Sequence, residues 1–289
     1  MISLSGALKQ FRRWRWARRA TAAGFLCLLV LGGFEWFPWF KGSMTATTVC
    51  GIVPFTDPLC ALEITLATRN WHASMLVGAA ALVMFAALFG PLFCGWLCPL
   101  GFLLDINDAF RRLVGRLVRR RPTRRVRAPS AIKYGVLGLV LGLSLVARLP
   151  AFQVLSPINI LVWGIVFTTG PALFVLAGIA VLEYVFPRVW CRSVCPLGAL
   201  YNLVGRFGLL RVRINQAATC RQHCGQCTQH CPMGIRVTED YTAQGKRTIN
   251  HMDCTRCGDC IDTCPNGVLR FGFGQPEHLT AENAEFAES

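Results

Sequence analysis

Long apolar runs separated by short polar segments dominate the first two thirds of this 289-residue chain. A helix that crosses a membrane needs about 20 mostly apolar residues. Four stretches meet that requirement, and they cover residues 20–40, 73–93, 131–150 and 167–186. The stretch 151–166 is also apolar, but Pro150 and Pro157 interrupt it, so we interpret it as a loop that dips into the membrane interface. The pattern therefore predicts an all-α membrane domain over residues 20–205, with four transmembrane helices.

The second and the fourth of these spans are followed by the same short motif. The sequence "FCGWLCPLG" follows one and "WCRSVCPLG" follows the other, so that Cys94 and Cys98 correspond to Cys191 and Cys195. Repeats that run in the same direction imply two halves related by a pseudo-two-fold axis along the membrane normal. We therefore expect the four helices to form two tandem two-helix repeats.

The basic residues set the orientation of these spans. The formal net charge is +15, with six Lys and Arg in residues 1–19 and nine arginines between Arg111 and Arg127. Such residues concentrate on the cytoplasmic side of a membrane protein. We therefore expect a bacterial inner-membrane protein whose N- and C-termini are both cytoplasmic. Because the charge lies beside apolar runs, a loop that touches anionic lipid is favoured over a nucleic-acid partner, and we expect no nucleic acid.

Two cysteine runs in the segment 206–274 have the spacing of a ferredoxin. "CTRCGDCIDTCP" is the bacterial run C-x2-C-x2-C-x3-C-P, and "CRQHCGQCTQHCP" differs only in its longer first gap. In such runs three thiolates hold one iron–sulfur cube and the fourth crosses over to the other cube. Zinc knuckles are the alternative, but the proline after each run, together with Gly225 and Gly258, argues against them. We predict a small α+β ferredoxin-like domain with two [4Fe–4S] clusters.

The crossover rule divides the eight cysteines into two sets of ligands. The first set is Cys220, Cys224, Cys227 and Cys264. The second set is Cys254, Cys257, Cys260 and Cys231. The remaining residues, 275–289, are acidic with little apolar content, and we expect a disordered tail there.

Clusters beside a membrane domain that lacks pairs of haem-binding histidines indicate an electron-transfer subunit, for which quinol is the natural membrane-soluble donor. Quinol oxidation needs a proton acceptor beside the ring. Ionisable groups are rare in and near the spans, so those present are candidates. The candidate acceptors are Asp57, His72 and Glu35, with Glu183 near the inner end of the fourth span. The alternative for each is an interfacial residue that meets water.

The paired motifs offer four more sulfurs, those of Cys94, Cys98, Cys191 and Cys195. Cysteines four positions apart on a helix lie on one face, one turn apart, and the following proline discourages continuation of the helix. The repeat can bring the four together as a third metal site, as two dithiol/disulfide couples, or as a site that transiently binds a partner's metal. Small residues that pack between helices are the alternative. Cys50 and Cys60 form a disulfide or are small buried residues.

These segments together resemble a known family. "GIVPFTDPL", "FCGWLCPLG", "WCRSVCPLGALY" and the two-cluster segment are similar to the NapH family, over roughly residues 20–274. NapH proteins are ferredoxin-type membrane components of a quinol dehydrogenase that serves periplasmic nitrate reductase. MauN-like proteins of methylamine utilisation share the layout, whereas NosR-like and CcoG-like proteins share the motifs but carry further soluble domains. The extra residue before Cys224, and "CPMG" in place of Cys-Pro-Glu-Pro, depart from the family pattern.

The resemblance implies electron flow from quinol to a periplasmic iron–sulfur protein of the NapG or MauM type, and then to a periplasmic cytochrome or reductase. The orientation expected above places both clusters in the cytoplasm, so the implied route must cross the membrane. A maturation factor that handles iron, copper or a thiol for a partner enzyme is an alternative function. A solute transporter built on the repeat is disfavoured because the spans hold few polar groups.

Overall fold

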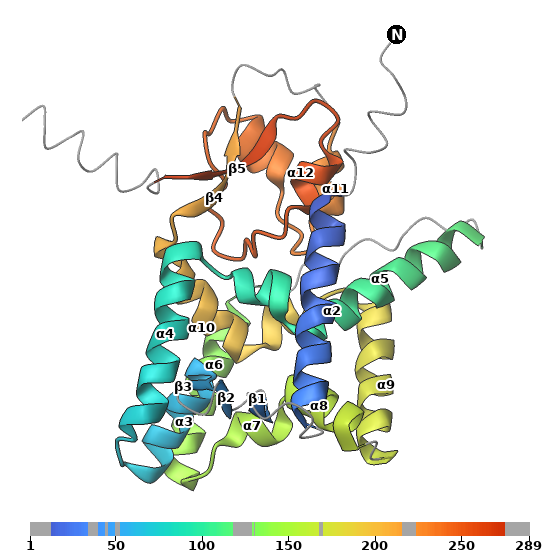
Figure 1. Cartoon of the computed structure of the whole chain (residues 1–289). Coiled ribbons are helices and arrows are strands. Elements are labelled where there is room, and N and C mark those ends of the chain that lie inside the picture. Colours follow the sequence, from blue (N-terminus) through green and yellow to red (C-terminus); the bar gives the residue numbers. More distant parts are fainter. Residues whose placement is uncertain are drawn as a thin grey trace, which may run out of the picture. The chain divides into compact units, whose positions relative to one another are not determined.

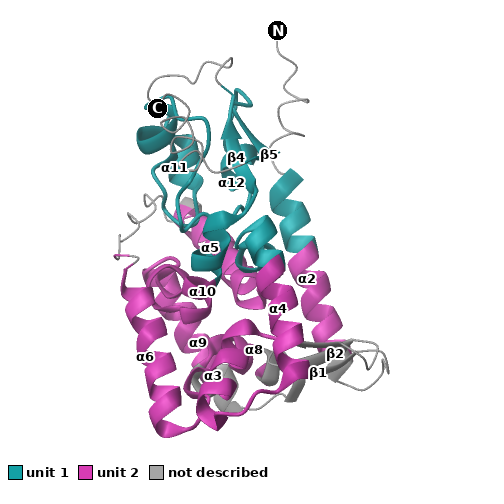
Figure 2. Cartoon of the chain, turned by 90° about the vertical axis from the view of Figure 1, so that its left-hand side faces the viewer, with its two compact units in different colours: residues 1–20, 85–96, 201–289 teal, residues 21–84, 97–200 magenta. Residues whose placement is uncertain are grey.

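The computed structural model describes residues 13–33, 40–43, 46–49, 53–117, 129, 131–167, 170–215 and 224–274 (Figure 1). The chain divides into two compact units, shown in teal and magenta in Figure 2. Unit 1 comprises residues 1–20, 85–96 and 201–289, and unit 2 comprises residues 21–84 and 97–200. Each unit is therefore assembled from stretches that lie far apart in the sequence.

Unit 2 is mostly helical. It contains most of α2 (Arg13–Gly33) and α4 (Ala73–Phe89), all of α3 (Pro58–Thr68), α5 (Pro99–Leu117) and α6 (Ile132–Ala147), and then α7 (Ala151–Leu155), α8 (Pro157–Phe167), α9 (Gly170–Val185) and the start of α10 (Pro196–Val204). Among these, α3 packs on α6, and α9 packs on α5 and α8. The helical content agrees with the predicted fold class.

A small antiparallel sheet in unit 2 was not predicted. Strands β1 (Phe40–Ser43), β2 (Ala46–Val49) and β3 (Val53–Thr56) follow one another in the sheet. Their register pairs Phe40 with Val49 and Thr47 with Phe55. The β-branched residues of "ATTV" favour this conformation, but four-residue strands give too short an alternation to recognise.

The segment 151–166, which we expected to be a loop, is helical. It forms α7 and α8, which are separated by Ser156. Pro157 occupies the first position of α8, where its missing N–H group leaves no helical hydrogen bond unmade. The proline therefore begins a helix here, and the prediction of a loop is wrong.

No single described helix is both long and apolar enough to cross a membrane. The segments Ile132–Ala147 and Ala151–Leu161 satisfy the requirement together, but they are bent by 111° at the break between them. Helices α3, α4 and the Phe174–Val185 part of α9 are apolar but shorter. The four predicted spans and their arrangement as repeats stay predictions.

A buried carboxylate ties three helices of unit 2 together. Glu63 in α3 is fully buried. Its Oε1 accepts hydrogen bonds from Ser144 Oγ in α6 (3.2 Å) and from the backbone N–H of Phe152 in α7 (2.9 Å). Buried polar groups need such partners because an unmade hydrogen bond costs about 1–3 kcal/mol. Glu63 therefore fixes where α3 lies against α6 and α7.

Unit 1 is the α+β part of the chain. It includes η3 (Gly205–Phe207), β4 (Leu210–Ile214), α11 (Gln226–His230), η4 (Thr238–Thr242), α12 (Asp259–Thr263) and β5 (Leu269–Phe273). Strands β4 and β5 pair antiparallel, from Leu210 opposite Phe273 to Ile214 opposite Leu269. Helices α11 and α12 pack on each other. As predicted, the C-terminal segment combines short helices with a small sheet.

A buried ion cluster in unit 2 generates a stability prediction. Arg188, with backbone φ of 58°, donates to Asp108 through Nε (3.3 Å) and to Asp105 through Nη2. Arg188→Gln removes the cation that two buried carboxylates share, which costs about 3–5 kcal/mol of unfolding free energy. Arg148 is the matched control, because it has the same left-handed backbone (φ 54°) but an exposed side chain. Thermal unfolding should show a large loss for Arg188→Gln and about 0.5 kcal/mol or less for Arg148→Gln; equal losses would contradict the account.

Candidate functional site

The two cysteine runs of unit 1 fold into two similar local structures. Helix α11 begins after Gly225 and helix α12 begins after Gly258, and both glycines have positive φ (55° and 78°). Each helix carries one buried cysteine, Cys227 or Cys260. Each ends at the last cysteine of its run, which a proline follows. Because the left-handed conformation favours glycine, these two positions let the chain turn sharply between consecutive cysteines.

Cysteine sulfur gathers in the core of unit 1. Cys227, Cys231 and Cys260 are buried in one apolar cluster with Val212, Met233 and Ile235, and Cys254 and Cys264 pack against it. Cys220, a predicted ligand of the first set, lies outside the described residues. The structure thus brings together cysteines from both runs.

The second predicted set of ligands is mutually close. Burial raises the pKa of the Cys260 thiol well above its usual value. Nearby sulfurs oppose its ionisation further, and they belong to Cys257, Cys254, Cys231 and Cys227. Burial likewise raises the pKa of Cys257 to about 12, with Cys231 among its neighbours. Such a crowd of thiols suits a metal cluster, because bound metal removes the thiol protons and balances the thiolate charge.

The donors suit iron–sulfur clusters, which cysteine thiolates hold in runs of this spacing, with one thiolate on each iron. Among the described His, Cys, Asp and Glu residues, no group of three or more is arranged around a single metal ion. When bound, a [4Fe–4S] cluster takes up and releases single electrons.

Both Cys-x3-Cys motifs adopt the same irregular conformation. Each forms a π-helix, η1 (Phe93–Leu97) or η2 (Trp190–Val194), and the second cysteine follows directly. The wider turn is visible in the hydrogen bond from Cys195 N–H to the carbonyl oxygen of Trp190, at 2.9 Å. The next proline begins another helix, α5 or α10. We had expected an α-helix that ends at the proline; π-helical turns are rare and are frequent at functional sites.

Three of the four motif cysteines lie near one another in unit 2. The pKa of Cys195 is raised to about 12, mainly by burial and also by the nearby Cys98 and Asp57, while the Gly198 N–H lowers it. Cys191 has Cys195 and Cys98 among its neighbours. The backbone N–H of Gly198 donates to Cys195 Sγ at 3.4 Å. Cys94 belongs to unit 1, so a common role for all four stays a prediction.

Asp57, one of the predicted proton acceptors, lies at the start of α3. It caps α3, and its Oδ1 accepts a hydrogen bond from the backbone N–H of Leu59 at 3.2 Å. The pKa of Asp57 is raised to about 7, mainly by burial. The Leu59 N–H opposes this shift, and the neighbouring Glu63 adds to it. Asp57 also lies near Cys98 and Cys195. This carboxyl can therefore exchange a proton close to neutral pH.

The other candidate acceptors differ from Asp57. His72 is exposed, directly before α4. Glu35 lies outside the described residues, as does Cys50, the partner of Cys60 in the predicted disulfide. Glu183 is buried, and its Oε1 accepts a hydrogen bond from Trp190 N–H at 2.8 Å. Sequence reasoning missed Glu63, although a single acid in the apolar "PLCALEITLA" was a usable signal.

The sequence matches two families of iron–sulfur proteins. One, described as a 4Fe-4S binding domain, matches residues 71–121 and 158–215, which contain the two Cys-x3-Cys motifs. The other, described as a 4Fe-4S dicluster domain, matches residues 212–265. No solved structure matches the chain.

Curated relatives are similar over nearly the whole chain. The ferredoxin-type protein NapH of Escherichia coli is 31% identical, over 91% of this chain and 92% of its own length. The methylamine utilization ferredoxin-type protein MauN of Methylorubrum extorquens is 30% identical, over 93% and 91%. NapH of Haemophilus influenzae is 29% identical, over 90% and 89%.

A cysteine substitution tests the two predicted sets. Anaerobically purified protein should hold about eight irons with matching acid-labile sulfide. Cys260→Ser should lose about half of that iron, because one cube loses a ligand from the core of its site. Cys60→Ser, at a buried cysteine of unit 2, should keep all of it. Zinc in place of iron, or an undiminished iron content in Cys260→Ser, would refute the assignment.

Proposed function

Because the chain belongs to the family of ferredoxin-type proteins that includes NapH and MauN, we propose that it is a membrane-bound electron-transfer subunit that oxidises quinol. Electrons then pass through two [4Fe–4S] clusters toward a periplasmic reductase system of the nitrate reductase kind. The immediate partner is a periplasmic iron–sulfur protein of the NapG or MauM type, followed by a cytochrome or reductase.

The observation that carries the quinol step is the position of Asp57. Oxidation of a quinol to a quinone releases two electrons and two protons, so a base must stand near the ring. A base works best when its pKa lies near the working pH. Burial brings the pKa of Asp57 to about 7, and its neighbours Cys98 and Cys195 belong to the Cys-x3-Cys motifs. The proposed proton acceptor and two motif cysteines thus lie near one another in unit 2.

Two further functions share part of this support. A role in methylamine utilisation, as the name of the MauN relatives states for them, uses the same electron route with a different acceptor. A maturation factor that handles a metal or a thiol for a partner enzyme uses the motif cysteines but not quinol.

Reduction by quinol separates these functions. Sealed membranes that contain the protein are mixed anaerobically with a reduced quinol, and the visible absorbance of the clusters is followed. We expect quinol to decrease the absorbance of the clusters at least as fast as the downstream system turns over. Clusters that dithionite reduces but quinol does not would contradict the proposal and favour a maturation role.

Replacement of Asp57 tests the proton acceptor. Asp57→Asn keeps an oxygen that can accept from Leu59 N–H, and it should slow quinol oxidation at least tenfold with unchanged iron content. In the wild type the rate should rise with pH through about 7, because the deprotonated carboxylate is the active form. Asp57→Asn should lose that rise. The exposed Glu239 provides the control, and Glu239→Gln should change neither rate nor pH profile. An unaltered pH profile in Asp57→Asn would remove Asp57 from the mechanism.

A further inference from the structure

Three buried arginines of unit 1 lie beside two cysteines of the second predicted set. Arg18, Arg211 and Arg256 are only 4%, 5% and 6% exposed. Arg211 and Arg256 are near Cys254, and Arg18 is near Cys257. They are all the buried arginines among the described residues of unit 1. Buried cations are costly, so their gathering at one place needs a reason.

Arg256 and Arg211 bring uncancelled positive charge to this place. Arg256 donates to the carbonyl oxygens of Gly205 (3.0 Å) and Phe89, which are neutral acceptors. Arg211 donates to the carbonyl oxygens of Gly208 and Arg206 and to Asn250 Oδ1, which are also neutral. Neither guanidinium forms an ion pair with a described carboxylate. A guanidinium stays charged at neutral pH, also when it is buried.

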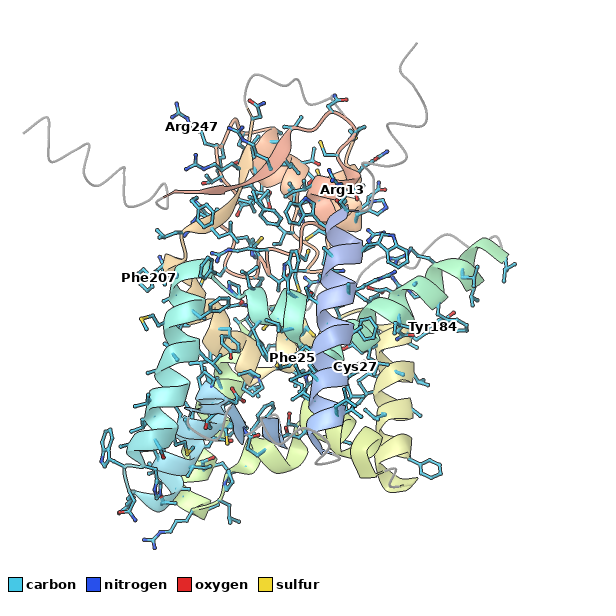
Figure 3. The ribbon with its side chains drawn as sticks, in the orientation of Figure 1. Arg13, Phe25, Cys27, Tyr184, Phe207 and Arg247 are labelled. Carbon is cyan, nitrogen blue, oxygen red and sulfur yellow. The ribbon has the colours of Figure 1, made fainter. Side chains whose placement is uncertain are left out.

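Arg18 belongs to α2, near the N-terminal end of the chain. The start of α2, which Arg13 marks in Figure 3, is hydrogen-bonded to α12, the helix that follows Cys257. Asp262 accepts the backbone N–H groups of Trp14 (3.2 Å) and Arg15 (2.8 Å).

Asp259, the first residue of α12, pairs with two arginines of α2. Its carboxylate contacts Arg15 Nε at 2.9 Å and Arg18 Nη1 at 3.3 Å. Arg18 is thereby held near Cys257 with a buried acid beside it. The pair Arg18 and Asp259 offers two charges of opposite sign near one cysteine.

The first Cys-x3-Cys motif contacts the chain between Cys254 and Cys257. Trp96 Nε1 donates to the carbonyl oxygen of Arg256 at 3.1 Å. A side chain on Gly95 would lie 2.6 Å from the carbonyl oxygen of Thr255, so only glycine permits this approach. In the second motif the corresponding position is Arg192, whose side chain forbids the same packing. The neighbours of Cys94 therefore lie against the chain between Cys254 and Cys257.

We propose that Cys254, Cys257, Cys260 and Cys231 form the higher-potential of the two cluster sites, and that Arg18, Arg211 and Arg256 set this order. An added electron is an added negative charge, and nearby buried cations stabilise it. This site takes the first electron, and it is the site that the first Cys-x3-Cys motif contacts. The inference rests on the proposed function, since it requires two redox-active clusters.

Opposite charge changes at Arg18 and Asp259 provide the test. In the purified full-length protein, a redox titration followed by electron paramagnetic resonance should resolve two one-electron steps. Arg18→Gln removes a cation and should lower the midpoint of the higher step. Asp259→Asn removes an anion and should raise the same midpoint. The lower step should move less in both variants, because the described contacts place both charges beside Cys257 of the higher-potential site.

Controls separate this effect from disruption of the fold. Arg270 on β5 is exposed, and Arg270→Gln should move neither step. Arg18→Lys keeps the charge and should keep the midpoint near that of the wild type. If Arg18→Gln does not retain its iron, the sign of the shift in Asp259→Asn decides the question.

The outcomes that contradict the inference are specific. Shifts of the same sign in Arg18→Gln and Asp259→Asn, equal shifts of both steps, or a shift confined to the lower step would overturn it. A wild-type protein without iron–sulfur signals would overturn the proposed function instead, so the two failures are distinguishable.

Discussion

Helix α12, which lies between Cys257 and Cys264, depends on buried ionic contacts with α2. Asp259 and Asp262 are both nearly inaccessible to water, and a buried carboxylate without a partner is strongly destabilising. Arg15 and Arg18, together with the first backbone N–H groups of α2, supply these partners. An N-terminal helix and the last cysteine run therefore form one unit although nearly the whole chain separates them.

Glycine permits a close approach at two points of this contact region. A side chain on Gly258 would lie 2.8 Å from Cβ of Trp14, and one on Gly95 would lie 2.6 Å from the carbonyl oxygen of Thr255. Trp14 in turn packs edge-on against Trp96 and Phe271, with ring centroids 6.0 Å and 4.8 Å apart. The two motifs share a backbone conformation, and the first, with its glycine, rests on the last cysteine run of the ferredoxin-like segment.

The features that the sequence predicted are those that local chemistry determines. The cysteine spacing, with a glycine inside each run, identifies the two runs. The contacts of Arg18 and Glu63 could not be predicted, because each depends on a partner far away in the sequence and no periodic pattern encodes such a pairing. The sheet β1–β3 was missed because its strands are short. The prediction of a loop at 151–166 was wrong because the sequence does not distinguish a proline at the first position of a helix from a proline that interrupts a helix.

Proton and electron chemistry thus occupy different parts of the chain in this account. Asp57 and the sulfurs of Cys98, Cys191 and Cys195 belong to unit 2, whereas the predicted cluster ligands belong to unit 1. Mössbauer spectroscopy of protein grown on enriched iron, before and after addition of quinol, tests the central claim most directly. We predict that all bound iron is in cubane clusters, about two per chain, and that quinol first converts one of the two to the reduced state. Mononuclear iron, or spectra that quinol leaves unchanged, would contradict the account.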